Sequence, residues 1–107
     1  MTIKVFLMDD HEVVRRGLHD LISSDPEMLV VGEAGTCAEG LQGIVTKQPD
    51  VAVLDVRLPD GSGIEVCRDL RGLMPHVNVL MLTSYADDEA LLSAVLAKRY
   101  PVLMDDL

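Results

Sequence analysis

Residues 51–55 read Val51-Ala52-Val53-Leu54-Asp55, an unbroken apolar run of strand-forming residues that ends in an aspartate. Such a run is typical of a central strand that other elements cover on both faces. Turn-forming residues are dense in the next stretch, residues 56–63, and a helical pattern begins after it. The whole segment therefore predicts a buried parallel strand, a loop and a helix in immediate succession.

The same alternation of strand and helix patterns recurs on both sides of this segment. Short apolar runs predict strands at 3–8, 28–31 and 77–82, with a turn region at 32–35. Helical spacing predicts four helices, whose expected core residues are Val14, Leu18, Leu21 and Ile22; Leu41, Ile44 and Val45; Ile64, Cys67, Leu70 and Leu73; and Leu91, Leu92, Val95 and Leu96. Four strand–helix units with short connections indicate an α/β fold, a doubly wound parallel sheet with helices on both faces.

Composition restricts the function further. The chain has 107 residues, which fits one domain, and a formal net charge of −9. A surface this acidic repels phosphate backbones, so we expect no direct nucleic-acid binding by this chain. No apolar run approaches the length of a membrane span, and the two cysteines match no metal or redox motif, which favours a cytoplasmic protein.

Polar side chains follow three of the predicted strands at the point where each strand ends. Asp9 and Asp10 follow the first strand, Asp55 ends the third, and Thr83 with Ser84 follows the fourth. In doubly wound sheets these ends meet at the functional crevice. Three carboxylates at one edge repel each other unless a cation intervenes. Mg²⁺ suits such oxygen ligands, and a carboxylate beside it can form an aspartyl phosphate.

Simpler interpretations exist for the residues around this edge. Asp9 and Asp10 could merely cap the first helix. We expect His11 to lie in a loop beside the site without binding a metal, and Arg15 and Arg16 to form a solvated helix face. The glycines at 61 and 63 are expected to shape the turn beyond Asp55.

The ordered combination of these motifs resembles the receiver domains of two-component response regulators. The motifs that carry the resemblance are Asp9-Asp10, Asp55, Leu58-Pro59-Asp60-Gly61-Ser62-Gly63 and Leu82-Thr83-Ser84. Residues 9–18 resemble the NarL/FixJ subfamily, and residues 55–61 and 82–85 resemble its DevR/DosR-like members. The resemblance covers roughly residues 3–97. It implies the flavodoxin-like receiver fold.

The resemblance also implies a role for each site residue. Asp55 would be the phosphoacceptor, and Thr83 would sense the phosphoryl group. Asp9, Asp10, Asp55 and the backbone carbonyl of Arg57 would hold Mg²⁺, one of the first two through water. A sensor histidine kinase would donate the phosphoryl group, and the change would alter homodimerisation or contacts with the chain's own DNA-binding output domain.

Residues 98–107 depart from the family pattern. Pro101 falls in the place of a glycine-rich turn, Val102 stands where an aromatic residue is often found, and Asp105 replaces the usual lysine. An aspartate there would repel the phosphoryl group that the lysine normally contacts. We therefore expect one receiver domain over 1–107, with an atypical tail at 98–107, no ordinary fifth strand, no fifth helix and no output domain.

Two other functions remain open at this point. The replaced lysine favours a pseudo-receiver impaired in phosphorylation, or a truncated module for dimerisation or interaction. The third possibility is an Mg²⁺-dependent phosphatase with an aspartyl nucleophile. Such enzymes usually carry a second aspartate two residues after the nucleophile, where this chain has Arg57. We therefore expect a regulatory domain with at most self-catalysed phosphotransfer and dephosphorylation, not an enzyme.

Overall fold

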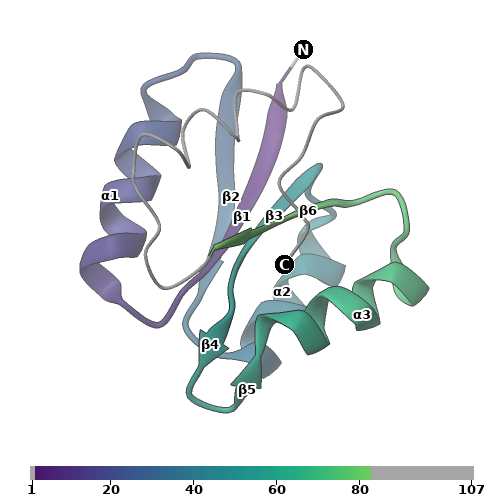
Figure 1. The fold of residues 1–107 in the computed structure, drawn as a ribbon. Coiled ribbons are helices and arrows are strands. Elements are labelled where there is room, and N and C mark those ends of the chain that lie inside the picture. The colour runs from purple at the N-terminus through teal and green to yellow at the C-terminus, as the bar shows by residue number, and fades with distance from the viewer. Residues whose placement is uncertain (1, 83–107) are drawn as a thin grey trace.

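The sheet at the centre of the molecule is parallel and carries helices on both faces (Figure 1). A computed structural model of the chain describes residues 2–82. Its strands lie in the order β2-β1-β3-β6 and comprise β1 (Ile3–Met8), β2 (Met28–Ala34), β3 (Val51–Asp55) and β6 (Asn78–Leu82). This order begins the doubly wound, flavodoxin-like arrangement and confirms the predicted fold class. The predicted fourth helix lies outside the described residues, and so does the atypical tail at 98–107, for which we expect no ordinary fifth strand.

Helix α1 (Glu12–Ser23) covers one face of the sheet, and helices α2 (Cys37–Lys47) and α3 (Gly63–Leu73) cover the other (Figure 1). Successive strand side chains point to opposite faces, so each strand contributes to both layers. The α1 layer is built from residues that include Val5, Leu7, Leu18, Ile22, Val51 and Val53. The α2–α3 layer includes Phe6, Met8, Ile44, Ala52, Leu54, Val66 and Leu70. All of β3 is buried, as predicted for the central strand.

The prediction of which α3 residues face the core is partly wrong. Ile64 and Leu73 are 41% and 62% exposed, whereas Val66 and Leu70 are buried. The helix begins at Gly63, and residues three and seven positions later lie on the same side of a helix as that first residue. Ile64, one position along, is rotated away from the sheet. In the other two predicted helices that the structure describes, Val14 and Val45 were also expected in the core but are exposed.

Two segments predicted as turns contain strand structure. Strand β2 continues through Gly32 and Glu33 to Ala34, past a shift of register opposite Val5 and Phe6. The loop after β3 contains a small antiparallel hairpin, β4 (Arg57–Leu58) and β5 (Gly61–Ser62). The turn residues in this loop therefore form a hairpin between β3 and α3.

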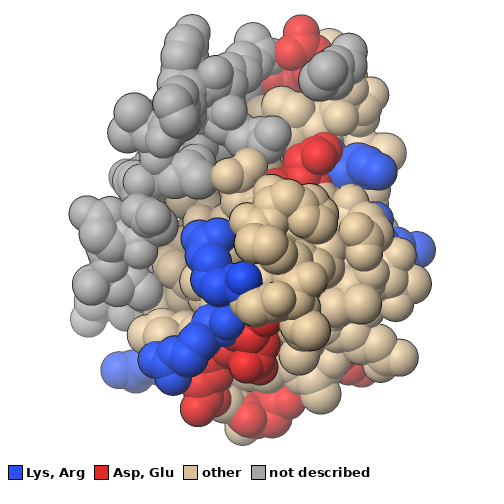
Figure 2. All heavy atoms as spheres, turned by 90° about the vertical axis from the view of Figure 1, so that its right-hand side faces the viewer, with Lys and Arg blue, Asp and Glu red and all other residues tan. Residues whose placement is uncertain are grey.

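Glycine allows α2 to lie directly against the sheet. A Cβ atom at Gly40 would overlap the side chain of Met8, so a larger residue there would require either Met8 or the helix to move. None of the helices within residues 2–82 has the length and apolar character needed to cross a membrane. Figure 2 turns the α3 side of the molecule toward the viewer and shows basic and acidic side chains next to one another. Several basic side chains lie in one stripe on the described part of that face, and acidic side chains border it.

Candidate functional site

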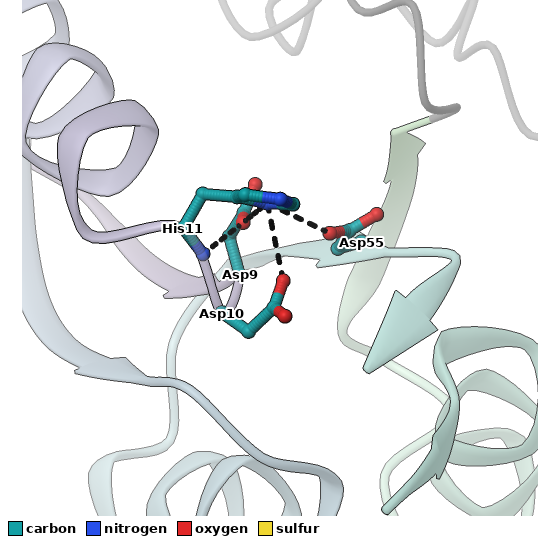
Figure 3. A group of neighbouring side chains, drawn as sticks. All are labelled: Asp9, Asp10, His11 and Asp55. Atoms are coloured by element: carbon teal, nitrogen blue, oxygen red, sulfur yellow. Dashed lines mark hydrogen bonds and ion pairs between the residues drawn. The ribbon is translucent and has the colours of Figure 1, made fainter. Parts of the chain in front are cut away.

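The carboxylates predicted to share one edge of the sheet do lie together. Asp9 directly follows β1, and Asp55 ends the neighbouring strand β3, so their side chains emerge at the same edge. Figure 3 shows both of them, with Asp10 and His11, converging on one point. One ligand atom from each of the four residues lies within 4.8 Å of the others. Thr83, predicted to sense the phosphoryl group, lies outside the described residues.

Backbone contacts hold Asp9 in place. Its N–H donates to the Ala34 carbonyl of β2 at 3.0 Å, and its carboxylate Oδ1 accepts the N–H of His11 at 2.8 Å. The guanidinium of Arg15 donates to the Asp9 carbonyl at 2.5 Å and pairs with Glu33 at 3.3 Å. Arg15 was predicted to be solvated, but it ties α1 to the ends of β1 and β2. This contact was missed because it depends on where the two strands end in space.

Asp55 is held from the other side by the loop that follows it. The N–H of Arg57 donates to Asp55 Oδ1 at 3.3 Å, which places the Arg57 backbone beside the carboxylate. Gly63 lies under the Asp55 carbonyl, where a Cβ atom would overlap the backbone oxygen. The N–H of Gly63 donates to the Val56 carbonyl at 2.9 Å, and the N–H of Val56 donates to Leu82 of β6 at 3.1 Å. The first residue of α3 therefore packs directly against the end of β3.

The side chains at this edge carry an excess of negative charge. Asp9 and Asp55 are only 4% and 7% exposed. Burial, and then the charge of Asp9, raises the pKa of the Asp55 carboxyl. The hydrogen bond with Asp9, followed by the charge of Asp10, raises the pKa of His11. Within residues 2–82, no lysine or arginine side chain forms an ion pair with these carboxylates, so their repulsion is offset only by His11.

The interpretation of Asp9 and Asp10 as simple helix caps fails. The residue that precedes α1 is His11, and its side chain makes no capping hydrogen bond. Asp9 accepts the N–H of His11, which lies before the first helical residue. The aspartates are therefore directed toward each other and toward Asp55, as required of a binding site.

A further aspartate, to which the sequence analysis assigned no contact, positions the loop beyond the site. The Asp60 carboxylate accepts the N–H groups of Cys37 and Ala38 at 2.7 and 3.1 Å, at the N-terminus of α2. These two hydrogen bonds lower the pKa of Asp60. Burial, and then the charge of Asp60, raises the pKa of the Cys37 thiol to about 11. Asp60 thus fastens the β4–β5 hairpin to α2.

The donor atoms at the edge of the sheet suit a divalent cation. Carboxylate oxygens are hard ligands, and Asp9, Asp10 and Asp55 present them from two adjacent strand ends without a neighbouring lysine or arginine ion pair in the described part of the chain. A bound dication would offset the burial and the charge of Asp9 that raise the pKa of Asp55. The site also leaves Asp10 about one-third exposed, so ligands can reach it from solvent.

Comparison with known proteins identifies the class to which this fold and site belong. The family model described as the response regulator receiver domain matches residues 5–103. The chain therefore belongs to the response regulator receiver domain family and is a receiver domain of two-component signalling. This family is regulatory. Its assignment does not favour the phosphatase or the phosphorylation-impaired module that the sequence left open.

Individual relatives refine this assignment. The chain is 59% identical over 105 residues to the DNA-binding transcriptional activator DevR/DosR of Mycobacterium tuberculosis, covering 98% of this chain and 48% of that protein. A LuxR-family response regulator from Aurantimonas is 28% identical, with a TM-score of 0.82 over 92% of this chain and 85% of that one. The receiver domain of the response regulator NarL from M. tuberculosis is 30% identical, with a TM-score of 0.73 over 89% and 77%. The chain spans about half the length of the curated relatives it matches.

Proposed function

We propose that Asp55 accepts a phosphoryl group from the phosphohistidine of a sensor histidine kinase, with Mg²⁺ as the cofactor. The observation that supports this most directly is the meeting of three carboxylates at the ends of β1 and β3, where the only ion-pair partner among residues 2–82 is His11. A structural role would leave such charges paired. An electron-rich carboxylate beside a cation site is the arrangement needed for a nucleophilic aspartate.

Each residue has a distinct part in this proposal. Asp9, Asp10, Asp55 and the backbone carbonyl of Arg57 would hold Mg²⁺, which would supply positive charge to stabilise the incoming phosphoryl group. The carboxylate of Asp55 is the nucleophile, and the Arg57 N–H holds its Oδ1 atom by a hydrogen bond. Asp9, held by Ala34 and Arg15, keeps its own carboxylate in position through this event.

Phosphorylation then acts as a switch. Thr83 follows β6, whose Leu82 pairs with Asp55 across the sheet, so we propose that its hydroxyl contacts the phosphoryl group. The added charge biases the domain between two conformations and alters homodimerisation or contacts with an output domain. Because DevR/DosR is a DNA-binding transcriptional activator, we extend the proposal to transcription regulation in the cytoplasm, with DNA contacted by an output domain and not by these acidic receiver residues.

The test is the intact mass of the protein after incubation with acetyl phosphate, with and without Mg²⁺. We expect an Mg²⁺-dependent gain of one phosphoryl group that Asp55→Asn abolishes. Asp69→Asn removes an exposed aspartate of α3 and serves as the matched control, which should still be phosphorylated. A folded wild type that gains no phosphoryl group would contradict the proposal and support a binding module that does not take part in phosphotransfer.

A further inference from the structure

The imidazole of His11 occupies an unusual place at the edge of the sheet. Its side chain is 67% exposed, yet the ring turns inward over the carboxylates (Figure 3). Its Nδ1 atom lies 3.0 Å from Asp9 Oδ1, 3.1 Å from Asp10 Oδ1 and 3.9 Å from Asp55 Oδ2. The side chain of His11 makes no capping hydrogen bond with α1, and its Nδ1 lies within hydrogen-bond distance of Asp9 instead. The ring therefore contacts the carboxylates and not the helix N-terminus.

The distances from His11 Nδ1 to the three carboxylate oxygens fit the shell around a metal ion. In an octahedron with bonds of about 2.1 Å, neighbouring ligand atoms lie about 3.0 Å apart and opposite ones about 4.2 Å apart. The separations of Nδ1 from Asp9 and Asp10 equal the first spacing, and its separation from Asp55 approaches the second. The backbone N–H of His11, bonded to Asp9 Oδ1, fixes the start of the side chain in this position.

We propose that His11 Nδ1 is a fourth protein ligand of the cation site, which would make the site favour a first-row transition-metal dication such as Mn²⁺ over Mg²⁺. Imidazole nitrogen suits the transition metals, whereas Mg²⁺ prefers a shell made of oxygen alone. This inference rests on the carboxylate site of the proposed function. It also replaces the expectation from the sequence that His11 lies beside the site without binding a metal.

The same geometry has one rival explanation with the opposite consequence. An imidazole that merely takes the place of a cation among the carboxylates would compete with every incoming metal ion. Removing it would then strengthen the binding of Mn²⁺ and Mg²⁺ alike. If His11 is a ligand, removing it weakens Mn²⁺ binding and leaves Mg²⁺ binding nearly unchanged. The sign of the change in Mn²⁺ affinity therefore separates the two explanations.

The experiment measures Mn²⁺ binding to the 107-residue chain by the electron paramagnetic resonance of free Mn²⁺, at mildly alkaline pH. Mg²⁺ affinity follows from displacement of bound Mn²⁺. We expect His11→Ala to weaken Mn²⁺ binding roughly tenfold, the lower end of the range for disturbed metal sites. We expect its Mg²⁺ affinity to change less than about twofold, because Mg²⁺ does not need the nitrogen. The hyperfine signal of a coordinated nitrogen should be present on Mn²⁺ in the wild type and absent in His11→Ala.

Two further variants make the result decisive. His19→Ala removes the histidine within α1, whose Nδ1 lies 3.8 Å from Asp20 Oδ1, and should leave Mn²⁺ binding and the nitrogen signal unchanged. Asp10→Asn tests the carboxylate site itself and should greatly weaken the binding of both ions. Mn²⁺ bound without a nitrogen signal, or bound more tightly by His11→Ala, would overturn the ligand role and leave the carboxylate site standing. Mn²⁺ binding that is absent, or insensitive to Asp10→Asn, would instead contradict the metal site of the proposed function.

Discussion

Asp55 ends β3 and Asp60 lies in the hairpin that follows it, yet the two carboxylates have opposite surroundings. Asp55 is buried at the end of β3, and burial with the charge of Asp9 raises its pKa. Asp60 is exposed in the hairpin turn, and the N–H groups of Cys37 and Ala38 lower its pKa. One carboxylate is placed among like charges, whereas the other receives two hydrogen-bond donors from a helix N-terminus.

This difference distinguishes the charge that we propose to be functional from a structural one. A carboxylate at a helix N-terminus satisfies free N–H groups and interacts favourably with the helix dipole. A buried carboxylate beside two others costs stability until a cation or another group neutralises it. The domain therefore stabilises its loop with Asp60 and keeps at Asp55 a charge whose neutralisation can drive binding.

The largest effect is expected at Gly63, whose contact with the Asp55 carbonyl shapes the functional end of the loop. Gly63→Ala places a Cβ atom onto backbone and should cost about 3 kcal/mol of unfolding free energy. Urea unfolding followed by circular dichroism measures this. Gly72→Ala, in the same helix, meets no heavy atom within 4 Å and should instead gain roughly 0.5–1 kcal/mol from helix propensity. Equal stabilities of the two variants would contradict the close packing of α3 on β3.

A smaller loss is expected when Asp60 is removed from the other end of the loop. Asp60→Ala leaves the N–H groups of Cys37 and Ala38 without their acceptors, so the melting temperature should fall by several degrees. The pKa of Asp60 is lowered by folding, so its contribution is present above the unfolded-state pKa and disappears as the pH falls through the folded value. The difference between wild type and Asp60→Ala should therefore shrink in acid.

Asp69→Ala removes an exposed aspartate of α3 and serves as the control for this loss. Its melting temperature should stay close to that of the wild type. A fall of the same size in both variants would show that general surface charge, and not the contact with α2, explains the result.

The different roles of these two aspartates also show what a sequence can predict. Asp55 was predictable because it ends a continuous apolar run, and the ends of parallel strands meet at one edge of the sheet. Asp60 was not, because its partner Cys37 lies 23 residues away and the contact depends on how α2 and the hairpin are placed. Locally, Asp60 followed by Gly61 indicates only a turn.

The same distinction applies to the rest of the fold and site. The alternation of strands with helices and the buried strand at 51–55 follow from periodicity, which is a local property. The outward position of Ile64 depends on the residue at which α3 meets the sheet, and the inward turn of His11 depends on the carboxylates around it. Neither is encoded in the spacing of apolar residues, so both required the three-dimensional structure.

An effect of opposite sign is expected when the charge of Asp55 is removed. Asp55→Asn relieves the repulsion from Asp9 and Asp10, so without divalent ions it should raise the unfolding free energy by about 1 kcal/mol. Folding raises the pKa of Asp55, so the wild type gains stability as the pH falls through the folded value, and the advantage of the variant should shrink there. Urea unfolding at neutral and acidic pH in a chelator measures this.

Mg²⁺ provides the control for that measurement. A cation that binds the folded site stabilises the wild type in proportion to its occupancy. Added Mg²⁺ should therefore stabilise the wild type more than Asp55→Asn and narrow the difference between them. A destabilised Asp55→Asn in chelator would mean that Asp55 is a structural charge like Asp60.

The smallest effect concerns the thiol next to Asp60. Burial and the charge of Asp60 raise the pKa of Cys37 to about 11, so little thiolate is present near neutral pH. Asp60→Asn removes that charge and should increase the alkylation rate of Cys37 roughly twofold, because reactivity follows the thiolate fraction. Peptide mass spectrometry after brief iodoacetamide treatment reads this rate against Cys67 in the same molecule. A general loosening of the fold would raise both rates, whereas loss of the Asp60 charge raises only that of Cys37. An unchanged ratio would mean that burial alone sets the pKa of Cys37, and that the influence of Asp60 ends at the two N–H groups it binds.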